Sequence, residues 1–405
     1  MSTVFPFHAL RPSPGTAAEV AAVPYDVVTV DEARALAHNK PLSFLHVSRA
    51  EIDLPPDTNP YSDQVYDRAA ANFALLKREA PLILESEASL YVYRLRMGAH
   101  VQTGVAACFS IDEYDRGVIK KHERTRQDKE DDRTRHMLEL RAQTGPVFLT
   151  YPVSAAIDDV VGRVTMCSTL TDFVAADAIQ HTLWRVPAES TAALVDAFAN
   201  VRALYIADGH HRAASAARVR DKLRARTGPG EWDTFMAVAF PDNQMNVLPY
   251  NRVVRDLNGH SPASLLAALR QQFDVREGVP APARSGHVSM FLDGRWYMID
   301  LGRAPDGLAA DERLDVSRLQ ALVLTPLLGI GDPRSDTRID FVGGVRGTTA
   351  LESQVAAGKA AVAFSMYPVG VADLMRISDA GGIMPPKSTW FEPKLRDGLL
   401  SHVIE

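Results

Sequence analysis

Residues 204–218 read Leu-Tyr-Ile-Ala-Asp-Gly-His-His-Arg-Ala-Ala-Ser-Ala-Ala-Arg, and this stretch decides how the chain folds around its polar groups. The apolar run 204–206 is typical of a buried strand, and the alanine-rich segment 213–217 has strong helix propensity. Gly209 stands at the break. The sequence therefore predicts a strand that turns sharply into a helix, with an acid, a glycine, two imidazoles and a guanidinium at the turn.

Such a turn is suited to bind phosphate. The first N–H groups of a helix have no partner within the helix, and the helix dipole favours negative charge there. Arg212 adds a bidentate fork. Two other interpretations exist: Asp208 caps the helix while the histidines bond to loop backbone, or the histidines bind zinc. The zinc interpretation is weak because the adjacent His210 and His211 are expected to point in different directions.

Size and composition indicate a globular chain with two domains. Its 405 residues are more than one hydrophobic core usually holds. Of these residues 46% are apolar and 23% are charged, which is typical of a globular chain. We expect one unit at 1–255, which contains a core at about 100–255, and a C-terminal α/β unit at 256–405 whose last loop returns to the site. Strands and helices alternate without a strict βαβ rhythm, so the expected fold class is α+β, or mixed α/β.

Charge and cysteine usage exclude several classes of protein. The formal net charge is 44 minus 50, or −6, and no basic tract stands apart from acidic residues, so nucleic acid is not an expected partner. Cys108 and Cys167 are the two cysteines, which favours reduced, packed thiols in the cytoplasm. The N-terminus has no signal-peptide pattern, and apolar runs stay short of a membrane span. Small-molecule partners are therefore favoured, and the sequence leaves the oligomeric state open.

Apolar patterning predicts several elements beyond the opening turn. Apolar residues recur at three- and four-residue spacing over 63–78, which predicts a helix. Segments 90–96 and 101–111 predict a hairpin that turns near Gly98. The short runs 22–28 and 44–47 predict strands and ordered loops. Pro-Tyr-Asp at 24–26 and His-Val-Ser-Arg at 46–49 are polar groups at the ends of apolar runs, and both are candidates to line the same pocket.

A second group of candidate residues precedes a highly charged segment. His122 and Glu123 lie in a loop, and a glutamate held near a bound phosphate is suited to deprotonate a substrate hydroxyl. Residues 120–135 carry interleaved charges of both signs and almost no apolar side chain, so we expect no core there. For most of 124–135 a solvated helical face is the favoured interpretation, but not for Glu123.

A third group lies near the C-terminus, where residues 387–394 read Lys-Ser-Thr-Trp-Phe-Glu-Pro-Lys. Lys387, Ser388 and Thr389 are suited to cover a nucleotide, but the same stretch is equally suited to dock the chain terminus. No dinucleotide fingerprint and no P-loop sequence occur in the chain. A P-loop kinase is therefore excluded.

Taken together, the motifs resemble a known family. The quoted motifs are Pro-Tyr-Asp-Val-Val at 24–28, Phe-Leu-His-Val at 44–47, Lys-His-Glu-Arg-Thr at 121–125, Ala-Asp-Gly-His-His-Arg at 207–212, and Met-Pro-Pro-Lys-Ser-Thr-Trp-Phe-Glu-Pro-Lys at 384–394. Over essentially the whole chain this order resembles the bacterial and archaeal family labelled domain of unknown function 1015. The family label carries no activity.

The central part also resembles the free L-serine kinases of the ParB/sulfiredoxin-like superfamily. That resemblance implies a ParB/sulfiredoxin-like core with large N- and C-terminal additions. It implies that Glu123 is the catalytic base with His122 as its orienting neighbour, and that Asp208 contacts Mg²⁺ or substrate. It implies phosphate or nucleotide contact, with ATP or ADP as co-substrate, for Gly209, His210, His211 and Arg212.

The resemblance leaves the reaction open. About eighty residues separate the two motifs, which is a departure from the kinases. A nucleotide-dependent free serine kinase is the favoured function, and a phosphatase acting on O-phosphoserine is an alternative that needs similar electrostatics. The non-enzymatic alternative is a ParB-like, nucleotide-binding regulator. A sulfiredoxin-like reductase is disfavoured because His210 stands where that chemistry needs a cysteine.

Overall fold

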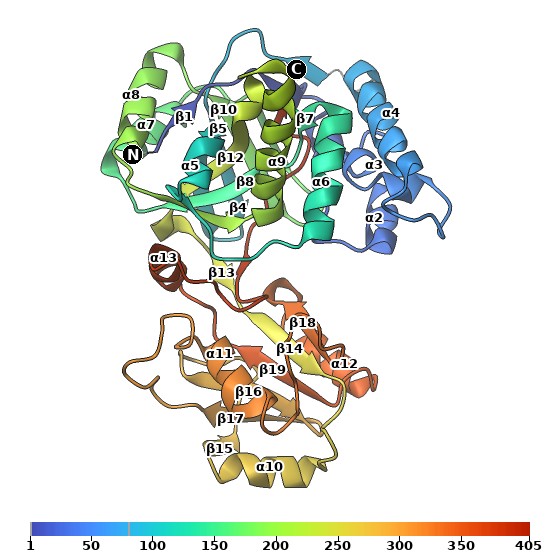
Figure 1. Ribbon diagram of the computed structural model, residues 1–405, viewed down its shortest axis with the longest axis vertical. Coiled ribbons are helices and arrows are strands. Elements are labelled where there is room, and N and C mark those ends of the chain that lie inside the picture. The colour runs from blue at the N-terminus through green and yellow to red at the C-terminus, as the bar shows by residue number, and fades with distance from the viewer. Residues whose placement is uncertain (1, 80–81) are drawn as a thin grey trace. The chain divides into compact units, whose positions relative to one another are not determined.

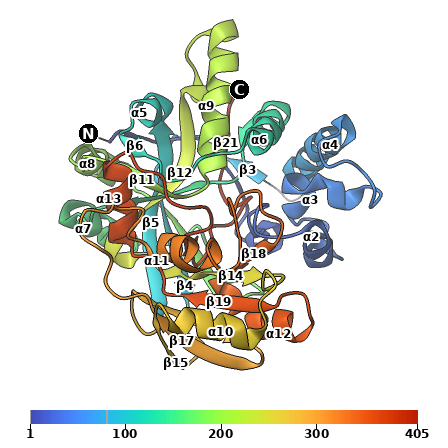
Figure 2. The same ribbon diagram turned by 60° about the horizontal axis from the view of Figure 1, so that its bottom comes forward.

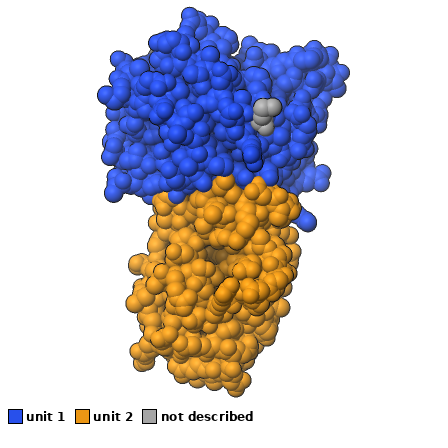
Figure 3. All heavy atoms as spheres, turned by 90° about the vertical axis from the view of Figure 1, so that its left-hand side faces the viewer, with its two compact units in different colours: residues 1–245, 393–405 blue, residues 246–392 orange. Residues whose placement is uncertain are grey.

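The computed structural model describes residues 2–79 and 82–405. In this part of the chain the fold is mixed α/β with several sheets. The chain divides into two compact units, shown in different colours in Figure 3. Unit 1 comprises Met1–Met245 and Pro393–Glu405, and unit 2 comprises Asn246–Glu392. Unit 1 is therefore built from two stretches of chain that are separated in sequence by the whole of unit 2.

A large mixed sheet forms the centre of unit 1 (Figure 1). Among the described residues its order is β6-β11-β8-β12-β5-β4-β10-β9, with β1 paired to β5. The pairs β6 with β11 and β8 with β12 are parallel, and the others are antiparallel. The strands are β1 (Val4–Phe5), β4 (Tyr91–Met97), β5 (His100–Ser110), β6 (Ile119–Lys120), β8 (Val147–Tyr151), β9 (Thr171–Val174), β10 (Ile179–Arg185), β11 (Leu204–Asp208) and β12 (Thr234–Pro241).

The alternation of side chains along the central strands explains how this sheet packs. Val105, Ala107 and Phe109 of β5 belong to one buried apolar cluster, and so do Phe235 and Ala237 of the neighbouring β12. Residues two apart lie on the same face of a strand, so each strand presents one apolar row to the helices on that face. The long helix α9 (His210–Thr227) contributes the alanines of its first turns to the same cluster.

A smaller sheet and a group of helices complete unit 1. The small sheet has the order β3-β2-β21-β7, and its strands are β2 (Ala9–Pro12), β3 (Leu82–Leu84), β7 (Ala142–Gln143) and β21 (Ser401–Val403). The other helices are α1 (Ala17–Val20), α2 (Val30–Ala37), α3 (Leu45–Ser48), α4 (Asp63–Glu79), α5 (Ile111–Asp115), α6 (Gln127–Leu140), α7 (Ala155–Val164) and α8 (Ala188–Ala199). Figures 1 and 2 both show α6 beside α9, where Ser215 Oγ donates to the carbonyl of Glu130.

Unit 2 has an antiparallel sheet of its own in the order β15-β17-β16-β19-β14-β18, and a short ribbon formed by β13 and β20. Its strands are β13 (Val247–Leu248), β14 (Tyr250–Val254), β15 (Asp274–Glu277), β16 (His287–Leu292), β17 (Arg295–Asp300), β18 (Ile339–Gly343), β19 (Val362–Met366) and β20 (Trp390–Phe391). Its α-helices are α10 (Pro262–Arg270), α11 (Asp315–Leu319), α12 (Thr349–Ala356) and α13 (Val371–Asp379). In the β13–β20 ribbon, Glu392 N donates to Asn246 O at 3.1 Å, so the entry to unit 2 and its exit are adjacent.

The structure confirms the longer predicted elements and corrects several shorter ones. The opening strand and helix are β11 and α9, the predicted hairpin is β4 with β5, and the helix over 63–78 is α4. The expectation of a strand or ordered loop at 44–47 is wrong, because these residues enter the short helix α3, whose Leu45 and Val47 are buried. A run of four apolar residues does not by itself distinguish a strand from a turn of buried helix.

Residues 120–135 hold no apolar side chain and so add nothing to the apolar core, as expected, but the solvated face expected over most of 124–135 is wrong in part, because polar side chains of this segment are buried. His122, Asp132 and Thr134 are buried, and Asp132 is held by Tyr66 and Arg133 through hydrogen bonds of 2.8 Å each. Paired charges can be buried because each partner replaces the other's water. Both cysteines are free, but only Cys108 is packed inside while Cys167 is exposed. Within residues 2–79 and 82–405, no helix has the length and apolar character needed to cross a membrane.

Candidate functional site

The turn after β11 has the backbone that its sequence requires. β11 ends at Asp208, α9 begins at His210, and Gly209 between them has a φ of +90°. A Cβ added to Gly209 would lie 3.1 Å from Arg212 Cζ and 3.4 Å from Val147 Cα. Glycine adopts this left-handed conformation at little steric cost. The interpretation of Asp208 as the helix cap is wrong, because Gly209 is the N-cap residue of α9 and has no side chain with which to cap it.

The parallel pairing of β6 with β11 brings the two sequence motifs together. Ile119 and Lys120 of β6 pair with the start of β11, so the loop after β6 runs toward the start of α9. His122 N donates to His210 Nε2 over 3.4 Å, and the two imidazole rings lie 4.4 Å apart at 86°. Glu123 Oε2 lies 3.9 Å from His210 Nδ1, and its side chain is 43% exposed. The candidate base therefore stands at the solvent side of two buried imidazoles.

His210 and His211 point in different directions, as expected for adjacent residues. His210 is buried against His122, whereas His211 Nε2 accepts a hydrogen bond from the backbone N–H of Arg126 at 3.0 Å. His211 therefore contacts the loop that leads into α6. Together the two imidazoles connect the start of α9 to both ends of the loop 122–126.

Two cations surround the Asp208 carboxylate. Asp208 Oδ2 accepts from Lys394 Nζ at 3.2 Å and from Arg212 Nη2 at 3.5 Å. The Arg212 guanidinium also reaches Asp26 Oδ2 at 3.5 Å and donates to the carbonyl of Pro146. Its side chain is 4% exposed. Three segments of unit 1, at Asp26, Pro146 and Asp208, thus converge on one buried guanidinium.

Burial and these charges set the ionisation of the site. Burial alone would raise the pKa of the Asp208 carboxyl, but Lys394 and Arg212 outweigh it and hold that pKa well below its ordinary value. Burial lowers the pKa of His122 to about 4 against the opposing charge of Asp208. Burial and the neighbouring His122 lower the pKa of His210 as well. At neutral pH the site therefore holds the ionised Asp208 carboxylate and Arg212 guanidinium beside two neutral imidazoles.

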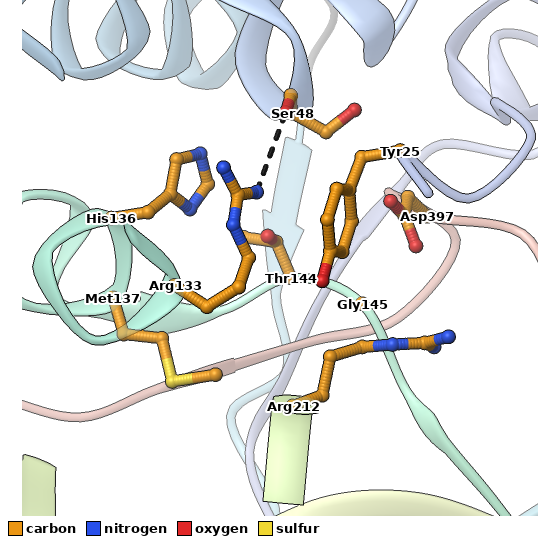
Figure 4. Close-up of a pocket in the computed structure, with 9 residues that line it drawn as sticks. All are labelled: Tyr25, Ser48, Arg133, His136, Met137, Thr144, Gly145, Arg212 and Asp397. Carbon is orange, nitrogen blue, oxygen red and sulfur yellow. Dashed lines mark hydrogen bonds between the residues drawn. The ribbon is translucent and has the colours of Figure 1, made fainter. Parts of the chain in front are cut away.

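A small pocket is lined in part by the Arg212 side chain (Figure 4). Its volume is about 20 Å³, which is room for about one or two water-sized groups. It is lined by Tyr25, Ser48, Arg133, His136, Met137, Thr144, Gly145, Arg212 and Asp397. The Arg133 guanidinium stacks over the Tyr25 ring at 4.1 Å and is paired with Asp132 at 2.8 Å.

Several polar atoms at this pocket have no hydrogen-bond partner among the described residues. They are Ser48 Oγ, Arg212 Nε and Asp397 Oδ1, and all three are buried. Burial also raises the pKa of the Asp397 carboxyl to about 7, although Arg212 opposes the shift. Gly145 leaves room for the carboxyl, since a Cβ added there would lie 2.9 Å from Asp397 Oδ1. Buried polar atoms normally have partners, so this pocket is suited to a small ligand group that both donates and accepts hydrogen bonds.

The remaining predicted residues lie in unit 2. Ser388 Oγ donates to the carbonyl of Pro385 at 2.6 Å, and the Lys387 carbonyl accepts from Arg252 Nη2 at 3.3 Å. Lys387 Nζ lies 5.5 Å from the centre of the Tyr250 ring. Lys387, Ser388 and Thr389 thus belong to the loop before β20, whereas the other candidate residues belong to unit 1.

Two residues at the site, Arg133 and Asp397, were missed by the sequence analysis. Arg133 was assigned to a solvated face, and Asp397 stood outside every quoted motif. Asp26 and Lys394 belong to motifs that the sequence analysis did name, but their pairing with Arg212 and Asp208 was not predicted. These pairs join parts of the chain that are distant in sequence, so local spacing carries no sign of them.

A family profile described as "Protein of unknown function (DUF1015)" matches residues 4–319, which is more than half of the chain. No curated protein matches.

Several solved structures are similar at low identity. A free serine kinase variant in complex with AMP is 13% identical, with 73% of this chain and 92% of that chain covered and a TM-score of 0.36. A variant in complex with ADP is 15% identical, with the same coverage and a TM-score of 0.35. SbnI with a C-terminal truncation, from Staphylococcus aureus, is 12% identical, with 74% and 87% covered and a TM-score of 0.40. With TM-scores below 0.5, these similarities carry no argument about what this chain does.

Proposed function

The chain belongs to the DUF1015 family, whose function is unknown, and we propose from its site that it is a nucleotide-dependent phosphotransferase acting on free serine. One observation carries the proposal: a half-exposed carboxylate, Glu123, lies beside a helix start that has no side-chain cap and is flanked by buried cations. Phosphoryl transfer needs a group that accepts the hydroxyl proton and positioned positive charge on the phosphoryl oxygens. The site holds both within one unit.

In the proposed reaction the serine hydroxyl oxygen attacks the terminal phosphorus of ATP or ADP. The Glu123 carboxylate takes the hydroxyl proton, while the bond from phosphorus to the bridging oxygen breaks and the shortened nucleotide leaves. His122 orients the loop that carries Glu123, because its buried ring packs edge to face on the His210 ring at 4.4 Å. The N–H groups at Gly209, His210 and His211 face the phosphate at the start of α9, where the helix dipole favours an anion.

Charge at the other side of the turn completes the proposal. Arg212 and Lys394 stabilise the negative charge that develops on the transferring group. Asp208 is paired with both of these cations. Asp208 is also the residue of this turn that would hold the expected Mg²⁺, which would neutralise charge on the nucleotide phosphates. Lys387, Ser388 and Thr389 stay proposed nucleotide-binding residues on the sequence evidence alone.

The pocket beside Arg212 is the proposed site for one end of the amino acid. Asp397 Oδ1 and Ser48 Oγ are able to accept from an ammonium group, and Arg212 Nε donates to a carboxylate. Serine itself is implied by the motif resemblance of 121–125 and 207–212 to free serine kinases. The same resemblance supports the proposal that residues 100–255 form a ParB/sulfiredoxin-like core.

The proposal is tested by ³¹P NMR on the purified full chain. With Mg²⁺, L-serine and either ATP or ADP, we expect a phosphoserine resonance to appear. Glu123→Gln should lower the rate by about 10²–10⁴-fold and leave nucleotide affinity unchanged. Glu139→Gln is the matched control, because the Glu139 side chain on α6 is similarly exposed at 44%.

Three outcomes would contradict the proposal. Full activity of Glu123→Gln would refute the role of the base. Release of phosphate from O-phosphoserine without nucleotide would identify a phosphatase instead. Nucleotide binding with no transfer in any mixture would identify a regulator.

A further inference from the structure

We propose that His122, Glu123 and His210 form a binding site for a Zn²⁺-like divalent transition-metal ion. Each of the three residues offers one ligand atom, and these atoms lie within 4.8 Å of one another. His210 Nδ1 and Glu123 Oε2 are 3.9 Å apart. Two ligands of a tetrahedral zinc ion stand about 3.3 Å apart, so small side-chain rotations bring the donors to coordinating distance.

A second observation points to the same ligand. His122 Nδ1 is buried and has no hydrogen-bond partner among the residues that the structure describes, and His122 as a whole is 3% exposed. A buried nitrogen without a partner is unfavourable, and a bound metal ion would provide that partner. Glu123 leaves the trio open to solvent on one side, so an ion has a path of entry and a position for water.

The donor set selects the class of ion. Two imidazoles and one carboxylate suit zinc and other first-row transition metals, whereas Mg²⁺ prefers oxygen ligands and keeps much of its water. The ion therefore differs from the Mg²⁺ that would accompany a nucleotide. When the ion binds His210 Nδ1, the ring proton is held on Nε2, and the 3.4 Å contact from His122 N–H is given up. That contact is longer than an ordinary hydrogen bond, so little is lost.

The site has a consequence that rests on the proposed function. Glu123 is the proposed proton acceptor, and a carboxylate bound to a metal ion is no longer available to take a proton. A Zn²⁺-like ion should therefore inhibit phosphoryl transfer, whereas excess Mg²⁺ supports the reaction. A chelator that removes the Zn²⁺-like ion should relieve the inhibition.

Metal binding is measured without nucleotide or serine, so its outcome does not depend on the activity. The full chain carries Cys167→Ser, because the exposed thiol would bind zinc by itself. After removal of metal with a chelator, Zn²⁺ is titrated by calorimetry in excess Mg²⁺, and Co²⁺ is titrated by its visible absorption. We expect one ion per chain, and an affinity at least about tenfold weaker in Glu123→Gln and in His210→Ala.

His211→Ala is the matched control, since that neighbouring imidazole contacts Arg126 N instead of the trio, and its Zn²⁺ affinity should equal that of the parent. Circular dichroism establishes whether each variant is folded. If His210→Ala does not fold, Glu123→Gln still tests the site, because it removes only a partly exposed charge. Absence of saturable binding in the parent would overturn the site, as would unchanged affinity in Glu123→Gln. Zinc binding by a chain with no transferase activity would keep the site and refute the proposed function.

Discussion

At the scale of single residues, Arg212 organises the site. It is buried between Asp26 and Asp208, and it borders the pocket that contains Asp397. A planar guanidinium serves several partners at once, which the point charge of a lysine does not. The residue predicted from sequence as a phosphate ligand therefore also holds unit 1 together.

We expect Arg212→Lys to lower the free energy of unfolding by about 1–3 kcal/mol, because the carbonyl of Pro146 and one of the aspartates lose a donor. Urea denaturation followed by circular dichroism measures the change. Arg218→Lys is the control, since that side chain is 32% exposed and pairs with Glu130 and Asp131 at the surface of α6. Equal effects of the two substitutions would contradict the structural role of Arg212.

The Asp397 carboxyl makes stability depend on pH. Burial raises its pKa in the folded chain to about 7, whereas an unfolded aspartate titrates near 3.9. The free energy of unfolding contributed by the protonated carboxyl is at its full value below about pH 4. It falls as the pH rises from about 4 through 7, by up to about 1.4 kcal/mol per pH unit.

Asp397→Asn removes this dependence of the free energy of unfolding on pH, because an amide does not ionise. The free energy of unfolding of the variant, minus that of the parent, should increase between about pH 5 and 7 and then level off. Denaturation with urea at a series of pH values gives this difference. A difference that does not change with pH would show that Asp397 titrates normally.

The sequence predicted part of the site at this scale. Asp208–Arg212 and His122-Glu123 were found because each is a short, dense group of polar residues beside an apolar run. Asp397 was not found, and the pairing of Lys394 with Asp208 was not predicted, since the two residues are 186 positions apart and local patterns contain no record of such a contact. The burial of Arg133 was hidden for the same reason, because its partner Tyr25 lies in another segment.

At the scale of elements, the strand-to-helix turn depends on one glycine. Gly209→Ala introduces a Cβ at 3.1 Å from Arg212 Cζ and requires a left-handed backbone, so we expect a loss of about 1–3 kcal/mol of stability and weaker nucleotide binding. Thermal unfolding and nucleotide titration measure the two effects.

Gly162 provides the comparison, because it lies inside α7 and a Cβ there meets nothing within 4 Å. Gly162→Ala should raise stability by about 0.5–1 kcal/mol. If Gly209→Ala were as stable as Gly162→Ala, the turn would not require its glycine.

Long helices and strands were easier to predict from the sequence than short ones. The seventeen residues of α4 repeat the helical apolar spacing several times, so the pattern is unambiguous. α3 has four residues, and its apolar content fits a strand equally well. Its helical form is decided by tertiary packing, since Phe44 contacts Phe73 of α4 edge to face at 6.1 Å.

At the scale of the whole molecule, unit 2 is an insertion within unit 1. Its first and last residues are adjacent, with Glu392 N bonded to Asn246 O. We expect a chain in which a short glycine-rich link replaces residues 246–392 to fold cooperatively, because closing so short a gap costs little entropy. A chain cut after Glu392 should instead lose cooperative unfolding, since β21 and the Lys394–Asp208 pair are gone.

Urea unfolding of the two shortened chains, followed by circular dichroism and intrinsic fluorescence, compares them directly. Equal stability of the linked and the cut chain would show that Pro393–Glu405 is dispensable. The division into two units was expected from length, but the interruption of one unit by the other was not, because composition changes little at either junction.

The return of Pro393–Glu405 to unit 1 also sets an order of events during synthesis. The ribosome must translate all of unit 2 before Lys394 exists, which takes on the order of ten seconds. Throughout that interval the nascent chain has β11, α9 and Arg212, but Asp208 lacks its lysine and β2 lacks its neighbour β21. The candidate site of the growing polypeptide therefore stays incomplete until translation is nearly finished, and a chaperone that protects the exposed edge of β2 would act in this period.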